Sequence, residues 1–219
     1  MGCDVKLRCP NVGDMAAAHE AGTTGSDADT TLSELSDVGA MTADADLTAS
    51  EVDPAGGVSR ERTFTWADPG AILAAGVGRS GTEVLAGFRD GAIPPPPITQ
   101  ALDFEGTAFG EGTAECRLTP QEFHYNPLGT VHGGVLATLL DTACGCAVHT
   151  LLPAGVFYTS LDLSLKFLRP VTVQTGPVTA HGNVVHLGRR TALAEARITD
   201  AAGKVYATAT SSCLILRPA

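Results

Sequence analysis

The sequence predicts an α+β fold in which one antiparallel β-sheet packs against one long helix. The first observation is a helical stretch over residues 133–152, which Pro153 and Gly155 terminate. The second is the segment 159–167, where odd positions are apolar and even positions are polar, the period of a half-buried strand. The third is the series of turn signals that separates the following strand-like segments. A single helix followed by consecutive strands indicates an antiparallel sheet that the helix covers on one face.

Three segments of different composition divide the 219-residue chain. Residues 1–60 are rich in Ala, Asp, Thr, Ser and Gly and lack aromatic residues, which predicts a disordered acidic tail. Residues 61–97 are expected to form a helical lead-in and a Pro-rich connector, with Asp68 capping one interrupted helix or the first of two short ones. Residues 98–219 are expected to form the α+β domain. Its strands are predicted at 101–109, 112–119, 157–168, 172–187, 190–200 and 203–216.

The formal net charge of −10 is concentrated at one end of the chain. Residues 1–60 contain eleven acidic and three basic residues, so the remaining chain is nearly neutral. A chain without a basic footprint is not expected to bind nucleic acid or an anionic membrane surface. We expect neither a membrane span nor a secretory signal, because no long uninterrupted apolar run is present. Together with six scattered cysteines, these features predict a cytoplasmic protein with reduced thiols.

Two short motifs suggest ligand sites, but their context favours structural roles. Residues 76–81 have the glycine spacing of a dinucleotide-binding loop, yet no strand precedes them and a proline run follows. Cys144 and Cys146 point about 200° apart on a helix, so one metal ion cannot bind both. Four further residues lack metal-ligand spacing and are expected at surface or strand positions: His124, His149, His181 and His186.

The most informative segment is 126–134, which reads Asn-Pro-Leu-Gly-Thr-Val-His-Gly-Gly and leads into the long helix. Gly133 and Gly134 allow a ligand to approach the backbone, and they leave N–H groups unpaired at the positive end of the helix dipole. Such donors can stabilise an oxyanion. The alternative is a tight turn into a buried helix, which the glycines considered alone favour.

Asp141 lies inside the same helix among apolar residues. A carboxylate in such a place is costly unless it is paired or used chemically. The residues on its face of the helix are small, so this face can admit a ligand or a closely packed strand. The structural alternative is a hydrogen bond from Thr138 or Thr142. We favour a catalytic carboxylate.

Gly133 and Asp141 are eight residues apart, which is about 12 Å along a helix. An oxyanion donor and a general base must each lie about 3 Å from the reacting group or its water. One helix therefore cannot bring both residues to one carbonyl. If both residues are catalytic, two copies of the helix must lie antiparallel, and the active site must span a dimer interface.

Four separated segments resemble the PaaI-like family of hotdog-fold acyl-CoA thioesterases. They are residues 126–141, 159–163, 167–171 and 188–190, within a resemblance that extends over about 98–216. The resemblance implies a hotdog fold, which is a long central helix wrapped by a curved antiparallel sheet, assembled into homodimers and homotetramers. It implies hydrolysis of an acyl-CoA to a free acid and CoA, with neither a metal nor a bound cofactor.

The resemblance also implies roles for individual residues. Asp141 would be the general base or nucleophile, and the Gly133 N–H would polarise the thioester carbonyl. The other positions implied at the reacting group are Asn126, His132, Thr159 and Ser160. The positions expected to meet the CoA phosphates are Arg169, Gly188, Arg189 and Arg190, because arginine suits phosphate oxygens. Solvated turn charges are an equal alternative for these arginines.

Two other functions are compatible with this fold. A non-catalytic acyl-CoA-binding module would not need a buried carboxylate at position 141. A hydratase generally needs a histidine beside the carboxylate, for which His132 is the candidate. The fold does not define the acyl group. We expect the acyl pocket to include residues of a partner subunit, and we expect removal of residues 1–60 to leave the activity largely intact.

Overall fold

The computed structural model describes residues 59–217, so the predicted tail lies outside the described residues except for its last two positions. The helices are α1 (Pro69–Gly76), α2 (Gly81–Arg89), α3 (Pro97–Leu102) and α4 (Gly133–His149), with 3-10 turns at Glu122–His124 and Val173–Thr175. The strands are β1 (Phe104–Gly110), β2 (Thr113–Leu118), β3 (Phe157–Ser160), β4 (Ser164–Phe167), β5 (Val178–Leu187), β6 (Thr191–Asp200) and β7 (Val205–Leu216).

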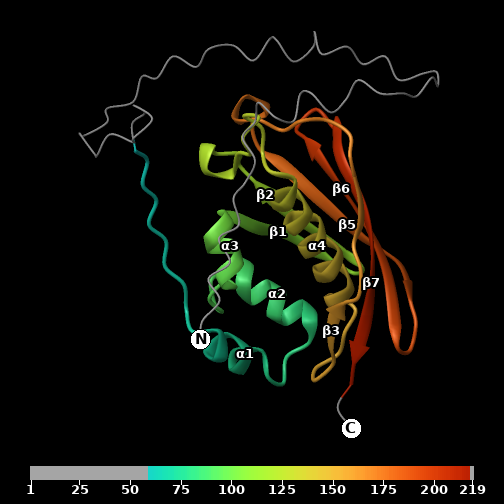
Figure 1. Ribbon diagram of the computed structural model, residues 1–219. Coiled ribbons are helices and arrows are strands. Elements are labelled where there is room, and N and C mark those ends of the chain that lie inside the picture. Colours follow the sequence, from blue (N-terminus) through green and yellow to red (C-terminus); the bar gives the residue numbers. More distant parts are fainter. Residues whose placement is uncertain (1–58, 218–219) are drawn as a thin grey trace, which may run out of the picture. The chain divides into compact units, whose positions relative to one another are not determined.

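The described strands form one antiparallel sheet in the order β1-β2-β5-β6-β7-β3, and β4 also pairs with β7. Figure 1 shows α4 lying across one face of this sheet. The predicted α+β architecture is therefore confirmed. The helix ends at His149, three residues before the predicted boundary. In the described part of the chain, no helix is long and apolar enough to cross a membrane.

Small residues allow α4 to approach the sheet closely. A Cβ atom added to Gly182 of β5 would lie 2.2 Å from the Ala143 carbonyl oxygen of α4, so only glycine fits there. The strand residues that face the helix are also small and buried, among them Ala180, Ala194 and Ala207. This close contact fixes the position of α4 on the sheet, and it therefore fixes the position of every functional group that α4 carries.

The lead-in contains the two short helices that were one of the predicted alternatives. Asp68 caps α1 by accepting a hydrogen bond from the Gly70 N–H at 2.9 Å. Ser80 caps α2 and forms a capping box with Glu83. The glycine-rich segment 76–81 is therefore a turn between two helices, as its context indicated.

Two predicted strand starts are wrong. The first strand was expected from residue 101, but α3 occupies 97–102 because a proline at its first position favours a helical start. The strand expected from residue 172 begins at Val178, because a 3-10 turn over residues 173–175 precedes it.

The single strand expected over 157–168 is two strands, β3 and β4. Asp162 interrupts the pairing, because its carboxylate accepts the Ser212 N–H of β7 at 3.1 Å in place of a backbone carbonyl. The alternation predicted a half-buried strand with apolar odd positions. Leu163 and Leu165 are partly buried against the core, but the two outer positions of the pattern are open in a single chain. Leu161 is 57% exposed and Phe167 is 51% exposed. The edge of the sheet at β3 and β4 is therefore apolar and open in one chain.

Candidate functional site

The N-terminus of α4 presents one unpaired backbone donor. His132 caps the helix, and its Nδ1 accepts the Gly134 N–H at 2.9 Å. Within residues 59–217, no group accepts the Gly133 N–H. A Cβ atom at Gly133 would lie 2.8 Å from the ring of Phe167, so the glycine also serves packing. The predicted oxyanion donor is thus available at the positive end of the helix dipole.

Asn126 builds the loop in front of this helix. Its Oδ1 accepts the N–H groups of Leu128 and Thr130 at 2.9 and 3.2 Å, and its Nδ2 donates to the Thr130 hydroxyl at 3.0 Å. Gly129 completes the turn with a positive φ of 75°. The side chain was predicted to place a water or the carbonyl. Its hydrogen bonds give it a structural role in shaping the loop, and one hydrogen of Nδ2 is left for a ligand.

A hollow of about 410 Å³ lies in front of the Gly133 N–H. Asn126, Gly133 and Arg169 line it, together with Phe167 and Leu168. The fold therefore brings Arg169 to the same place as Asn126 and Gly133, which belong to one motif. We call this place the Gly133 end of the site.

Asp141 pairs with the strand at the edge of the sheet. Its Oδ1 accepts a hydrogen bond from the Ser160 hydroxyl of β3 at 2.9 Å. Neither Thr138 nor Thr142 satisfies the carboxylate, because their hydroxyls donate to the Gly134 and Thr138 carbonyls one turn earlier. The hydroxyl that pairs with Asp141 is therefore neither of the two named in the structural alternative. We call the Asp141–Ser160 pair the Asp141 end of the site.

A thiol beside this carboxylate is not a competing nucleophile. The pKa of Cys144 is raised to about 12, first by burial and then by the negative charge of Asp141. The thiol therefore stays protonated at neutral pH, and a protonated thiol is a poor nucleophile. Cys146 lies on another face of α4 and hydrogen-bonds Cys116, so the two helix cysteines point apart as predicted. No group of three His, Cys, Asp or Glu side chains within 59–217 could hold a metal.

The two ends of the site do not meet within one chain. Neither Asp141 nor Ser160 lines the hollow at Gly133, and eight residues of a rigid helix separate Gly133 from Asp141, about 12 Å. Thr159 and Ser160 are both exposed on β3, and only the Ser160 hydroxyl forms a hydrogen bond with Asp141.

The predicted phosphate-binding arginines also divide between the two ends. Arg169 donates to the Val205 carbonyl at the start of β7, whereas the Arg190 carbonyl accepts the Ile215 N–H near its end. Ten strand residues separate these two points, about 33 Å. Gly188, Arg189 and Arg190 form the β5–β6 turn, and Gly188 N–H donates to the Thr191 carbonyl at 2.8 Å. One chain therefore does not bring the predicted phosphate-binding residues together.

His124 is a positioning residue that the sequence did not reveal. It is 1% exposed, although a surface or strand position was expected. Its Nδ1 accepts the Gln121 N–H at 3.0 Å and its Nε2 donates to the Leu102 carbonyl at 2.8 Å, while its own carbonyl accepts the His132 N–H. Burial lowers its pKa. The neutral ring therefore ties α3 to the loop that leads into α4. His149 lies at the end of α4, inside the predicted helix, and is half-buried there.

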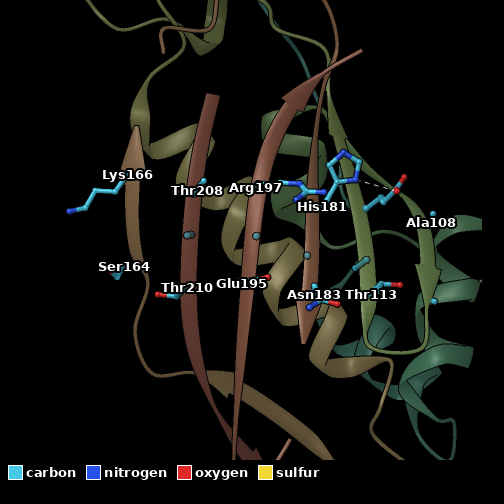
Figure 2. Close-up of a pocket in the computed structure, with 16 residues that line it drawn as sticks. Ala108, Thr113, Ser164, Lys166, His181, Asn183, Glu195, Arg197, Thr208 and Thr210 are labelled. Atoms are coloured by element: carbon cyan, nitrogen blue, oxygen red, sulfur yellow. Dashed lines mark hydrogen bonds and ion pairs between the residues drawn. The ribbon is translucent and has the colours of Figure 1, made fainter. Parts of the chain in front are cut away.

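One hollow of the described chain lies away from the predicted site. It measures about 800 Å³ and lies on the face of the sheet turned away from α4 (Figure 2). Polar side chains of neighbouring strands surround it, including Lys166, His181, Glu195 and Arg197. The hollow contains none of the predicted site residues.

The fold and the site geometry define a hotdog protein with a carboxylate on its central helix. Residues 128–207 match the family model described as Thioesterase superfamily. Human acyl-coenzyme A thioesterase 13 is 31% identical over 119 residues, which cover 50% of this chain and 83% of that protein. The chain therefore belongs to the thioesterase superfamily, and the resemblance to its PaaI-like hotdog members is confirmed.

Solved structures agree with this family. A thioesterase from Haemophilus influenzae superposes with a TM-score of 0.55 and 26% identity, covering 61% of this chain and 90% of that chain. The PaaI protein of the E. coli phenylacetic acid degradation operon gives a TM-score of 0.51 and 25% identity, covering 55% and 85%. The chain spans 62% and 48% of two curated relatives from Haemophilus influenzae and Halobacterium salinarum, which are 35% and 40% identical and carry the word esterase in their names.

Proposed function

We propose that this protein hydrolyses the thioester of an acyl-CoA and that two copies of the chain build each active site. The observation that carries the proposal is the Asp141–Ser160 pair, in which a hydroxyl on β3 orients a carboxylate on the central helix. Membership of the thioesterase superfamily and the name of the human relative support the reaction. The cytoplasmic location and the homotetramer stay predictions.

The chemistry follows from the two oxygens of Asp141. Ser160 holds Oδ1, and no described side chain holds Oδ2. As a general base, Oδ2 takes a proton from water while the water oxygen adds to the thioester carbonyl carbon. The carbonyl oxygen becomes an oxyanion that accepts the Gly133 N–H of the other copy. The C–S bond then breaks, the CoA thiolate takes up a proton, and the acid is released.

In the nucleophilic version, Oδ2 adds to the carbonyl carbon itself. Loss of CoA leaves an anhydride between Asp141 and the acyl group, and water then cleaves the anhydride. The two versions differ in the fate of water oxygen. Turnover in ¹⁸O water labels the Asp141 carboxylate only if Asp141 is the nucleophile and water attacks at its carbonyl carbon. If water attacks the acyl carbon of the anhydride, both versions give label in the product alone.

Gly133 and Asp141 are about 12 Å apart along one helix. An antiparallel pair of α4 helices brings the two groups together, because it sets the Asp141 end of one copy beside the Gly133 end of the other. The same arrangement brings the Arg169 side of one copy toward the Arg189 and Arg190 turn of the other, where the CoA phosphates would lie. The open edge at β3 and β4 supplies an apolar surface for this pairing, with Leu161 and Phe167 exposed along it.

The alternative functions fit the geometry less well. A hydratase needs a free imidazole beside the carboxylate, but the Nδ1 of His132 caps α4 and only Nε2 is left for chemistry. A binding module has no use for a carboxylate oriented by a dedicated hydroxyl on a neighbouring strand. A second observation favours hydrolysis over binding: the Gly133 N–H is left unpaired, as an oxyanion donor must be.

The direct test measures thiol release from a panel of acyl-CoAs by the full chain. We expect Asp141→Asn to lower kcat by about 10²–10⁴-fold, the range for a positioned acid or base. The matched control is Glu195→Gln, which removes a carboxylate on the opposite face of the sheet and is expected to leave kcat unchanged. Unchanged turnover in Asp141→Asn, or no thiol release by the natural chain, would overturn the proposal.

A further inference from the structure

The edge strand β3 faces one row of residues on α4. Asp141, Gly145 and His149 follow one another at a spacing of four, so they lie along one face of the helix. Tyr158 and Ser160 are two positions apart on β3, so their side chains point to the same face of the sheet. Figure 1 shows β3 beside the C-terminal half of α4. The Asp141–Ser160 pair therefore has a neighbouring contact one turn further along the helix, which Tyr158 makes.

Tyr158 packs directly on the helix backbone at Gly145. A Cβ atom added to Gly145 would overlap the Tyr158 hydroxyl, and it would lie 2.7 Å and 2.8 Å from the Cε2 and Cζ atoms of the ring. Contacts this short do not occur between packed atoms, so only glycine fits here while the ring stays in place. The fit between the ring and the helix therefore fixes how closely β3 approaches α4.

The Tyr158 ring also contacts His149. The two ring centroids are 5.6 Å apart and the ring planes are inclined by 56°, within the range of favourable aromatic contacts. His149 is itself held by α2, because a Cβ atom at Gly81 would lie 2.5 Å from the His149 Cδ2 atom. The Gly81 N–H donates to the Leu152 carbonyl at 3.0 Å, which ties the start of α2 to the chain just after α4. The lead-in therefore supports the ring through His149, although α2 lies outside the matched region 128–207.

Tyr158 holds the edge strand more firmly than the hydrogen bond of Ser160 does. β3 has four residues and pairs with β7 on one side only. The Ser160–Asp141 hydrogen bond is exposed, and such a bond contributes little net stability. The Tyr158 ring is partly buried and packs against the core. Burial raises the pKa of its hydroxyl well above the usual range, so the residue is uncharged at neutral pH. The position of Ser160 therefore follows from the position of Tyr158.

We propose that Tyr158 is a positioning residue for the reaction, because its contact with Gly145 places β3 so that the Ser160 hydroxyl reaches Asp141. This inference rests on the proposed function. Tyr158 acts through Ser160 and not on the reacting group itself. A change that displaces the ring therefore lowers kcat by breaking the Ser160–Asp141 hydrogen bond, and it leaves KM nearly unchanged.

The first test displaces the ring from the side of the helix. Gly145→Ala adds a methyl group where the Tyr158 ring lies, and alanine favours a helix more than glycine does, so α4 is not weakened. We expect kcat to fall by about tenfold to a hundredfold, the scale for a misplacement of about 1 Å, with KM within about twofold. The matched control is Gly76→Ala on α1, where the added Cβ atom makes an ordinary contact of 3.5 Å with Val84. Its kcat is expected to be unchanged.

Two double variants distinguish positioning from a general loss of packing. In a Ser160→Ala chain, Gly145→Ala is expected to lower kcat no further, because the hydroxyl through which it acts is already absent. If the two losses multiply, or if Ser160→Ala alone leaves kcat unchanged, the proposal is wrong. Tyr158→Leu makes room for the added methyl group, and we expect it to raise kcat of the Gly145→Ala chain by at least about fivefold. No recovery would mean that the overlap with the ring does not cause the loss.

A crystal structure of the Gly145→Ala chain separates this inference from the proposed reaction. We expect the distance between Ser160 Oγ and Asp141 Oδ1 to exceed about 3.5 Å, compared with 2.9 Å in the natural chain. If the natural chain releases no thiol but this displacement is found, the hydrolase proposal fails and the positioning of Ser160 by Tyr158 stands. If the hydrogen bond keeps its length in the variant, the positioning assignment is wrong, whatever the activity.

Discussion

The Gly133 end and the Asp141 end of the site are built by different means. At the Gly133 end the backbone acts: Asn126 folds a loop, His132 caps the helix, and one N–H group stays unpaired. At the Asp141 end two side chains act, and a single hydrogen bond of 2.9 Å joins α4 to the edge strand. Because both ends lie on one rigid helix, loop movement cannot bring them together. The comparison therefore supports the proposal that each copy contributes one half to each of two shared sites.

The largest effect expected at the Gly133 end comes from removing its N–H group. Gly133→Pro deletes the donor at the first helical position, where proline fits, and we expect kcat to fall by about 10²–10³-fold. Gly133→Ala is the matched control, because its Cβ meets the same Phe167 ring while the N–H is kept. If both variants lose the same activity, packing against Phe167 explains the loss and the oxyanion role is wrong.

A smaller effect is expected for the arginines that the proposed pairing of two copies would bring together. Arg169→Ala and Arg190→Ala should each raise KM for an acyl-CoA about fivefold with little change in kcat, since an exposed ion pair is worth up to about 1 kcal/mol. The same variants should leave an acyl-pantetheine unaffected, because it lacks the nucleotide phosphates. Arg197→Ala, in the hollow on the opposite face, is the control. An equal rise in KM for both substrates would exclude phosphate binding.

The smallest expected effect is on the pH dependence of the free energy of unfolding. Burial lowers the pKa of His124 and of His149 in the folded chain. The unfolded chain therefore binds more protons below the ordinary histidine pKa of about 6.5, and the free energy of unfolding decreases as the pH falls through that value, by at most about 1.4 kcal/mol per pH unit for each histidine. Denaturant unfolding between pH 7.5 and 5 measures the slope.

The control for that slope is His124→Gln, which keeps hydrogen-bonding groups but does not titrate. It should reduce the slope without removing it, because His149 still contributes. An unchanged slope would show that His124 is not held neutral by its burial. A steeper slope would mean that another group dominates acid unfolding.

Local patterns predicted the elements that depend on near neighbours in the sequence. Asp68 and Pro69 indicated the start of α1, and the glycine pair with its apolar helix indicated α4. The failures involve distant partners. Asp162 interrupts an alternating strand because it meets Ser212 of β7, fifty residues away. His124 hydrogen-bonds the Leu102 carbonyl, twenty-two residues away. Such contacts have no local signature.

For the site, too, the sequence indicated individual residues but not the contacts between distant elements. Asp141 was identified because an unpaired carboxylate inside an apolar helix is energetically costly, and Gly133 because it lies at the start of that helix. Their separation alone led to the dimer hypothesis. The choice of Ser160 over Thr159 needed strand pairing, because only the register of β3 on β7 decides which hydroxyl faces α4.

One measurement tests the shared active site most directly. If the site is shared, the Asp141→Asn chain and the Gly133→Pro chain are each inactive alone. Unfolding the two variants and refolding them together forms mixed dimers. A mixed dimer contains one site with both natural groups, so random pairing of equal amounts should restore about a quarter of the natural turnover. If the mixture stays as inactive as its two components while mixed dimers are present, each chain completes its own site and the shared-site account is wrong.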